Sequence, residues 1–511
     1  MTGTSEAMLA SDFSTLADLI RAHARERGDK TAIASADATI SYAALDARMD
    51  RIAAALQRDG VAQGSAVAIL AAPTIDYAAL FLGTLRAGSV ATPLAPSATP
   101  EQVAAMVRDC AAPLLFVDAA SAATLAGQPL SARTIRMDTD AFDNWLAPEG
   151  VDPAPVTVSP GDAFNIIYSS GTTGTPKGIV QPHAMRWAHI ARAAAGFGDA
   201  VTMIATPLYS NTTLVSFLPT LAWGGTAVLT GKFDARAFLE LAERYRATHA
   251  MLVPVQYQRI MALPDFDRFD LSSFRLKTCT SAPFSAALKA DVLARWPGML
   301  VEYYGMTEGG GTTVLIANAH PDKLHTVGVP IEGHDIRLID ENGREVAPGE
   351  TGEVVGRSPA MMTGYHGRSE ATRDAEWHDA QGNRYIRHGD VGRFDAEGFL
   401  ILMDRKKDLI ISGGFNIYPS DLEAVLARHP DVADCAVVGM PSQAWGETPV
   451  GFYVARDGAA ADSAEILDWF NGRVGKTQRL SALEQVDELP RSSIGKVLKR
   501  ALRDGYLAAT Q

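Results

Sequence analysis

The chain has 511 residues, of which 47% are hydrophobic and 21% are charged, so it can bury a large core and divide into several lobes. Its formal net charge of −13 at pH 7 makes nucleic acid an unexpected partner, because a polyanion would have to be met by a local basic pocket. Three cysteines without a CxxC pair argue against a disulfide framework and a zinc site: Cys110, Cys279 and Cys435.

The sequence also lacks the signals of membrane insertion and secretion. It contains no run of about 18 apolar residues, and its first residues have neither the basic stretch nor the apolar core of a secretory signal. We therefore expect no transmembrane segment and a cytoplasmic location.

The first third of the chain alternates helical and extended segments. Residues 41–60 carry apolar side chains at helical spacing, and residues 65–70, SAVAIL, are typical of a buried strand. The same alternation recurs in residues 76–96 and 101–118. This order of elements predicts an α/β fold.

The pattern changes at about Ile336, where branched residues alternate with turn residues such as Asn342-Gly343. We expect an antiparallel, β-rich subdomain there. After residue 404 a shorter stretch again alternates helix and strand, which predicts a small α+β domain. The expected domains are residues 1–403 and residues 404–511, hinged near Asp404.

The segment YSSGTTGTPKGIV, residues 168–180, combines glycines and hydroxyl side chains with one lysine. A strand is expected before it and a helix after it, so we expect the segment at a strand-to-helix turn, where phosphates bind. Glycines let the backbone approach a ligand, while hydroxyls, N–H groups and a lysine meet phosphate oxygens. Pro176 interrupts the Walker A pattern. The expected phosphate contacts are Ser169, Ser170, Gly171, Thr172, Thr173 and Lys177.

This segment resembles the phosphate-binding signature of the adenylate-forming superfamily, which includes acyl-CoA synthetases, 4-coumarate:CoA ligases, firefly luciferases and adenylation domains of nonribosomal peptide synthetases. Four further segments resemble family motifs in the family's order, and together the motifs cover nearly the whole chain. They are YYGMTEGG (303–310), RHGDVGRFDAEGFL (387–400), DRKKDLIISGGFNIYP (404–419) and LPRSSIGKVLKR (489–500).

The resemblance implies an enzyme that activates a carboxylic acid with ATP as an acyl-adenylate, releases pyrophosphate, and passes the acyl group to coenzyme A. It implies Lys496, Thr173 and Glu308 as catalytic residues, with Glu308 holding Mg²⁺. Further implied ATP or coenzyme A contacts are Tyr304, Gly305, Thr307, Asp390, Arg405, Lys407, Gly413 and Gly414. The resemblance also implies a rotation of the small domain about Asp404-Arg405 between the two steps. His388, where many relatives carry threonine, is interpreted as structural.

The acyl group is expected to lie beside these motifs. Many relatives have a histidine where this chain has Ser210, which favours a roomier pocket floor, unless Asn211 or Tyr209 fills the space. The expected acyl contacts are Tyr209, Ser210, Asn211, Ser216, Thr280, Ser281, Gly309, Gly310, Val329 and Pro330. The expected substrate is a monocarboxylic acid with an aryl, alicyclic or medium-to-long aliphatic tail.

Four alternatives stay open from the sequence. An amino-acid adenylating enzyme would need a carboxylate near residues 209–213, and none is present there. An acyl-adenylating enzyme that loads a carrier protein, and a luciferase-like oxygenase, would share the motifs. A nucleotide-binding regulatory protein without catalysis is disfavoured, because the motif residues Thr173, Glu308, Asp390, Arg405 and Lys496 occur together.

Overall fold

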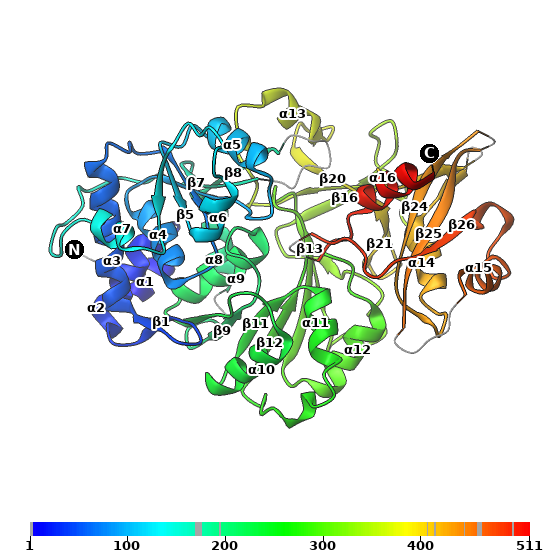
Figure 1. Ribbon diagram of the computed structural model, residues 1–511, viewed down its shortest axis with the longest axis horizontal. Helices are drawn as coiled ribbons and strands as arrows, with labels where there is room; N and C mark the ends of the chain where they lie inside the picture. The colour runs from blue at the N-terminus through cyan, green and yellow to red at the C-terminus, as the bar shows by residue number, and fades with distance from the viewer. Residues whose placement is uncertain are drawn as a thin grey trace. The chain divides into compact units, whose positions relative to one another are not determined.

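The computed structural model describes residues 4–168, 176–193, 196–405, 407–412, 415–443, 445–456, 462–492 and 495–510. The side chains of Arg405, Phe415, Asn416, Thr477 and Thr510 lie outside that description. The chain forms two compact units (Figure 1). The first contains Met1–Leu324, Pro330–Asp335 and Arg357–Ile386, and the second contains His325–Val329, Ile336–Gly356 and Arg387–Gln511.

The first unit contains two large sheets. The nine-stranded sheet has the order β15 (Val329–Pro330), β14 (Thr312–Ile316), β13 (Met299–Gly305), β12 (Leu276–Cys279), β11 (His249–Leu252), β9 (Val201–Ile204), β10 (Thr226–Leu229), β1 (Thr31–Ala34), β2 (Thr39–Ser41). The seven-stranded sheet has the order β18 (Gly364–Tyr365), β8 (Gly178–Pro182), β7 (Ala163–Tyr168), β4 (Val90–Pro93), β3 (Ala66–Leu70), β5 (Leu114–Val117), β6 (Arg133–Arg136).

The helices of this unit alternate with the strands, as an α/β fold requires. They are α1 (Ser5–Leu9), α2 (Leu16–Arg27), α3 (Tyr42–Arg58), α4 (Ile75–Arg86), α5 (Pro100–Asp109), α6 (Ala119–Thr124), α7 (Asp140–Trp145), α8 (His183–Arg192), α9 (Asn211–Ala222), α10 (Ala235–Arg244), α11 (Pro254–Met261), α12 (Ala286–Arg295) and α13 (Ser369–Asp374). The predicted helix in residues 41–60 and strand in residues 65–70 are confirmed as α3 and β3.

Two helices of this unit carry residues of the candidate site. Helix α8 packs on β7 and β8 of the seven-stranded sheet, α9 packs on β9, β10 and β11 of the nine-stranded sheet, and the two helices contact each other. The opposite face of the nine-stranded sheet is covered by α10, α11 and α12, which Figure 1 draws in green. Because side chains alternate along a strand, Met203 faces α10–α12 while Ile204 faces the core around α9.

The second unit contains smaller sheets together with helices. One sheet is formed by β16 (Asp335–Ile339), β17 (Gly352–Arg357), β20 (Arg384–Phe394) and β21 (Leu400–Arg405). The start of β20 also pairs with β19 (Glu376–His378) within the first unit. The other sheet contains β23 (Phe415–Ile417), β22 (Ile410–Ser412), β25 (Gly446–Ala455), β24 (Val432–Ser442) and β26 (Ala482–Gln485). Its helices are α14 (Pro419–Leu426), α15 (Ser463–Asn471) and α16 (Lys499–Thr510). The predicted small α+β region is thus present.

One local expectation is wrong. The glycine-threonine segment does not lead from a strand into a helix, because β8 stands between it and α8 and pairs antiparallel with β7, with Tyr168 opposite Gly178. The branched residues Ile179 and Val180 favour this extra strand. The segment therefore connects two strands of a hairpin.

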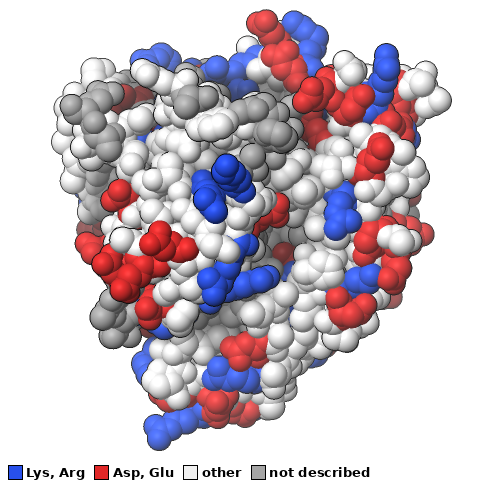
Figure 2. All heavy atoms as spheres, turned by 90° about the vertical axis from the view of Figure 1, so that its right-hand side faces the viewer, with Lys and Arg blue, Asp and Glu red and all other residues white. Residues whose placement is uncertain are grey.

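The surface carries charged side chains of both signs. Figure 2 shows a face on which Lys and Arg side chains are interspersed among Asp and Glu side chains. Within the described residues, no helix combines the length and the apolar character that a membrane crossing requires.

Candidate active site

Lys177 is the one predicted phosphate contact of the glycine-threonine segment whose position the structure describes. Ser169, Ser170, Gly171, Thr172 and Thr173 lie outside the described residues. The Lys177 Nζ atom lies 5.0 Å from the ring centroid of Tyr365, a cation–π arrangement that fixes the direction of the lysine side chain.

Tyr365 connects this lysine to the predicted metal-binding carboxylate. Its hydroxyl donates a hydrogen bond to Oε1 of Glu308 at 2.9 Å. Burial, and then the Glu308 carboxylate, raise the pKa of Tyr365, so the phenol keeps its proton and continues to donate. Lys177 and Glu308, which the sequence places in separate motifs, therefore lie on either side of one tyrosine.

The backbone around Tyr365 reinforces this arrangement. The N–H of Met362 donates to the carbonyl of Glu308 at 2.8 Å, and the N–H of His366 donates to the carbonyl of Gly178 at 2.7 Å. Strand β18 pairs with β8 between these two contacts. Residues 362–366 thus join the end of the phosphate segment to the segment that carries Glu308.

At Gly309 the backbone lies so close to the backbone of Ala360 that only a residue without a side chain fits. Its φ angle is +79°, and a Cβ atom built on it would lie 1.8 Å from the carbonyl oxygen of Ala360. The hydroxyl of Ser358 donates to the Gly309 carbonyl at 2.8 Å. Only glycine can adopt this position, which sets the direction of Glu308.

A buried arginine that the sequence analysis did not identify supports Thr307. Arg186 on α8 is 1% exposed. Its guanidinium donates to three amide oxygens and not to a carboxylate: to Asn165 Oδ1 at 3.0 Å, to Asn211 Oδ1 at 2.9 Å and to Gln181 Oε1. Gln181 in turn donates to the Thr307 carbonyl at 2.7 Å. Thr307, an implied ATP or coenzyme A contact, and Asn211, a predicted acyl contact, are thus held by one network.

Ser210, which stands where many relatives have a histidine, has a structural role. It is 8% exposed and caps the N-terminus of α9, where its hydroxyl accepts a hydrogen bond from the Thr212 N–H at 3.3 Å. The Thr212 hydroxyl lies 2.5 Å from that of Ser281, whose φ angle of +83° is strained for a residue with a side chain. The structure therefore joins the predicted acyl contacts at residues 209–212 to those at residues 280–281.

The other predicted acyl contacts lie beside residues 210 and 281, in β15, and between β13 and β14. Tyr209, Thr280, Val329 and Pro330 are half-buried, and Gly310 is buried. Their contact with an acyl group stays a prediction.

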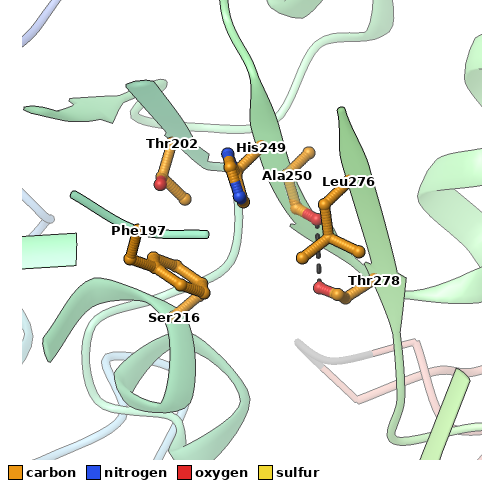
Figure 3. Close-up of a pocket in the computed structure, with 7 residues that line it drawn as sticks. All are labelled: Phe197, Thr202, Ser216, His249, Ala250, Leu276 and Thr278. Atoms are coloured by element: carbon orange, nitrogen blue, oxygen red, sulfur yellow. Dashed lines mark hydrogen bonds between the residues drawn. The ribbon is translucent and has the colours of Figure 1, made fainter. Parts of the chain in front are cut away.

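Ser216 lines a small cavity beneath α9 (Figure 3). The cavity has a volume of about 10 Å³, which is close to the space that one water molecule needs. Its other lining residues are Phe197, Thr202, His249, Ala250, Leu276 and Thr278. The Thr278 hydroxyl donates to the Ala250 carbonyl at 3.0 Å, so the cavity wall is held by the sheet itself.

His249 makes this region sensitive to acid. It is 3% exposed, and burial, with a smaller contribution from Arg275, lowers its pKa to about 4. The unfolded chain binds a proton at this residue near pH 6.5 and the folded chain does so only near pH 4, so stability is lost as the pH falls through that window.

We therefore expect His249→Gln to reduce the pH dependence of stability. Between pH 7 and pH 5 the variant should lose about 2 kcal/mol less free energy of unfolding than the unsubstituted chain. Urea unfolding of both proteins at the two pH values measures the difference. An equal loss in both proteins would show that His249 is protonated in the folded state.

In the second unit, two of the implied ATP or coenzyme A contacts occupy paired positions on neighbouring strands. Asp390 on β20 pairs in register with Arg405 on β21. Asp404, the neighbour of Arg405, accepts a hydrogen bond from the Ser420 N–H at 2.7 Å, which joins the predicted hinge to α14. His388 is 9% exposed, in keeping with the structural role expected for it.

Lys496 lies in a turn that is held in place from both sides. The N–H of Ser492 donates to the Lys496 carbonyl at 2.8 Å, and the N–H of Lys496 donates to the Ser492 hydroxyl at 3.2 Å. The Arg491 guanidinium binds the Gly495 carbonyl at 2.8 Å and the Asp434 carboxylate at 2.5 Å. Lys407 is exposed, and Gly413 and Gly414 lie outside the described residues.

Among the described contacts around Lys177, Tyr365 and Thr307, Glu308 is the one acidic side chain that is available to a metal ion. No group of three or more His, Cys, Asp or Glu side chains is placed to hold a metal within the part of the chain that the structure describes. A Mg²⁺ ion bound through one carboxylate and substrate phosphates needs no such group. The donor set is therefore compatible with Mg²⁺ bound together with a nucleotide.

Comparison with known proteins agrees with these motifs. The AMP-binding enzyme family matches residues 20–366, and the AMP-binding enzyme C-terminal domain matches residues 421–496. The chain belongs to the AMP-binding enzyme family. Within the adenylate-forming superfamily, it is an AMP-forming acid:CoA ligase that uses ATP and coenzyme A.

Individual relatives cover almost the whole chain. A feruloyl-CoA synthase from Amycolatopsis sp is 34% identical over 492 residues, which are 94% of this chain and 96% of the relative. An indoleacetate–CoA ligase from Aromatoleum aromaticum is 32% identical over 96% of this chain and 97% of the relative. The crystal structure of ATP-bound MatB from Rhodopseudomonas palustris is 30% identical, with a TM-score of 0.84 over 97% of this chain and 100% of that one.

Proposed function

We propose that the acid has an aryl, alicyclic or medium-to-long aliphatic tail, that an aryl tail is favoured, and that Mg²⁺ assists its adenylation. Adenylation with Mg²⁺ is supported by one observation, the contacts of Tyr365 with Lys177 and with Glu308, the residue that follows Thr307. The aryl preference is supported by the names of the feruloyl and indoleacetate relatives, whose lengths this chain matches almost fully.

In the proposed reaction the chain's own residues place the reactants and balance charge. Lys177 meets the terminal phosphates, and Thr307 meets the α-phosphate at which the carboxylate attacks. Glu308 holds Mg²⁺, which neutralises phosphate charge when bound. Lys496 donates to the carboxylate and the α-phosphate while negative charge develops. Rotation about Asp404-Arg405 then withdraws Lys496 and admits the thiol.

A pyrophosphate-release screen tests this proposal. The purified chain is given ATP and Mg²⁺ with aryl, alicyclic and aliphatic acids of matched concentration, and each acid that releases pyrophosphate is then tested with coenzyme A. We expect the largest kcat/KM with an aryl acid, because specificity follows the ratio of these values. A higher value for a long-chain aliphatic acid would contradict the aryl preference.

The same screen tests whether adenylation requires Mg²⁺ and which thiol accepts the acyl group. Chelation of Mg²⁺ should abolish pyrophosphate release with every acid that serves as a substrate. Replacement of coenzyme A by a phosphopantetheinyl carrier protein distinguishes the second candidate, because one relative, from Streptomyces coeruleorubidus, is named as a fatty acid–acyl-carrier-protein ligase. Thioester formation on the carrier protein alone would contradict a coenzyme A ligase.

A further inference from the structure

Gln181, on β8, is a buried residue whose hydrogen-bonding capacity is completely used. Its Oε1 atom accepts from Asn165 Nδ2 at 2.9 Å and from the guanidinium of Arg186. Its Nε2 atom donates to the Thr307 carbonyl at 2.7 Å and to Asn211 Oδ1 at 3.3 Å. An amide side chain has two acceptor lone pairs and two donor hydrogens, so all four positions of this amide are occupied.

The orientation of the Gln181 amide is fixed by its partners. A guanidinium can only donate and a backbone carbonyl can only accept, so the amide oxygen must face Arg186 and the amide nitrogen must face Thr307. Gln181 and Asn165 are 0% exposed, and Arg186 is 1% exposed. Because the group is buried, water cannot replace a hydrogen bond that the amide loses.

The Thr307 carbonyl is the point at which this amide acts on the candidate active site. The carbonyls on either side of it accept from backbone N–H groups: that of Met306 from Gly309 at 3.0 Å, and that of Glu308 from Met362 at 2.8 Å. Within the described residues, no backbone N–H donates to the Thr307 carbonyl, which is held by the amide side chain. Substitution of that one side chain can therefore release Thr307 and leave the bonds of both neighbours in place.

Arg186 gives the amide a charged partner. In the part of the chain that the structure describes, its guanidinium donates to amide oxygens and to no carboxylate. Hydrogen bonds from a charged donor are stronger than those between neutral groups, so the Arg186 charge fixes Oε1 of Gln181 and, through it, the direction of Nε2. A carboxylate at position 181 would meet a guanidinium whose charge has no other counter-ion.

We propose that Gln181 is a positioning residue for adenylation, which sets Thr307 against the α-phosphate of ATP. The inference rests on the proposed function, in which Thr307 meets the α-phosphate. The nitrogen that holds Thr307 also donates to Asn211, the first residue of α9, so the nucleotide motif and the predicted acyl site share one donor. Because Gln181 acts through Thr307 on the reacting geometry, its loss should lower kcat more than it raises KM.

Gln181→Glu tests this role with the smallest change in shape. The carboxylate still accepts from Asn165 and Arg186, and it forms an ion pair with the guanidinium, so the free energy of unfolding should stay close to that of the unsubstituted chain. It cannot donate to the Thr307 carbonyl. In pyrophosphate release with the best acid of the screen, we expect kcat to fall about 10- to 100-fold and KM for ATP to change much less. Urea unfolding of the same preparations measures stability.

Gln256→Glu is the matched control. Gln256, on α11, is 6% exposed, donates to the Ala205 carbonyl at 2.6 Å and accepts from the Val253 N–H at 3.0 Å. Its substitution also removes a buried donor from a backbone carbonyl, but among the described residues it contacts neither Thr307 nor a guanidinium. Any loss in this variant should appear in the free energy of unfolding and not in the kcat of the folded enzyme.

The remaining outcomes separate positioning from a structural role. An unchanged kcat in Gln181→Glu would overturn the proposal, and so would a loss of kcat that disappears at a temperature at which the variant is fully folded. If Gln181→Glu does not fold, Gln181→Met, which also lacks the donor, provides the same comparison, and an unchanged kcat in it would overturn the proposal. Absence of pyrophosphate release by the unsubstituted chain with every acid would instead contradict the proposed function.

Discussion

Lys496→Ala is expected to lower the rate of acyl-adenylate formation by about 10²- to 10³-fold, the usual effect of removing one donor that is aimed at developing charge. The conversion of a supplied acyl-adenylate to the CoA thioester should be largely unchanged, because the proposed rotation has by then withdrawn the lysine. Separate assays of the two half-reactions, one by pyrophosphate release and one by thioester formation, measure the effects.

Lys476→Ala is the control for this experiment. Lys476 is an exposed lysine of the second unit, whereas Lys496 is half-buried, and Lys476 lies in the short helix Lys476–Gln478, outside the motif that carries Lys496. It should behave like the unsubstituted chain in both assays. Equal damage to both half-reactions by Lys496→Ala would contradict a role confined to the first step.

Gly309→Ala is expected to lower adenylation by about 10²-fold or more, because the new methyl group forces Glu308 and Ala360 apart. The Cβ atom would lie 1.8 Å from the Ala360 oxygen, and a displacement of about 1 Å in a catalytic group typically has a 10²-fold effect on rate. Pyrophosphate release with the best acid measures the loss.

Gly349→Ala separates this clash from backbone strain. Gly349 has a φ angle of +85°, but a Cβ atom there would meet nothing within 4 Å. Both variants therefore have the same backbone strain of about 1 kcal/mol, because alanine must adopt a left-handed φ angle in each. Only in Gly309→Ala does the new methyl group also displace a neighbour. Similar adenylation rates in the two variants would contradict the role given to the approach of Ala360.

Much of this arrangement follows from local sequence patterns. The periodicity of residues 41–60 and the apolar run at residues 65–70 predict α3 and β3, because burial of one helix face or of a whole strand leaves a pattern in the sequence. The family motifs likewise place Glu308 and Lys177 in a common site, and the contacts through Tyr365 are in keeping with that expectation.

Other features have no local pattern. Tyr365 is 57 residues from Glu308, and the partners of Arg186 come from β7, β8 and α9, so only the folded chain shows these contacts. The strand β8 is not predicted by the sequence, because it is short and follows glycines that favour a turn into a helix. The sequence predicts a roomier pocket floor at Ser210, which stays a prediction, and only the folded chain shows that Ser210 also caps α9.

The guanidinium of Arg186 also has a consequence for how the enzyme responds to pH. Burial lowers its pKa to about 9, and neutral amides leave its charge uncancelled. At neutral pH it remains protonated, so a constant positive potential acts behind Thr307 throughout turnover. The pH profile of adenylation below pH 8 should therefore report groups that titrate there, with this arginine contributing an invariant background.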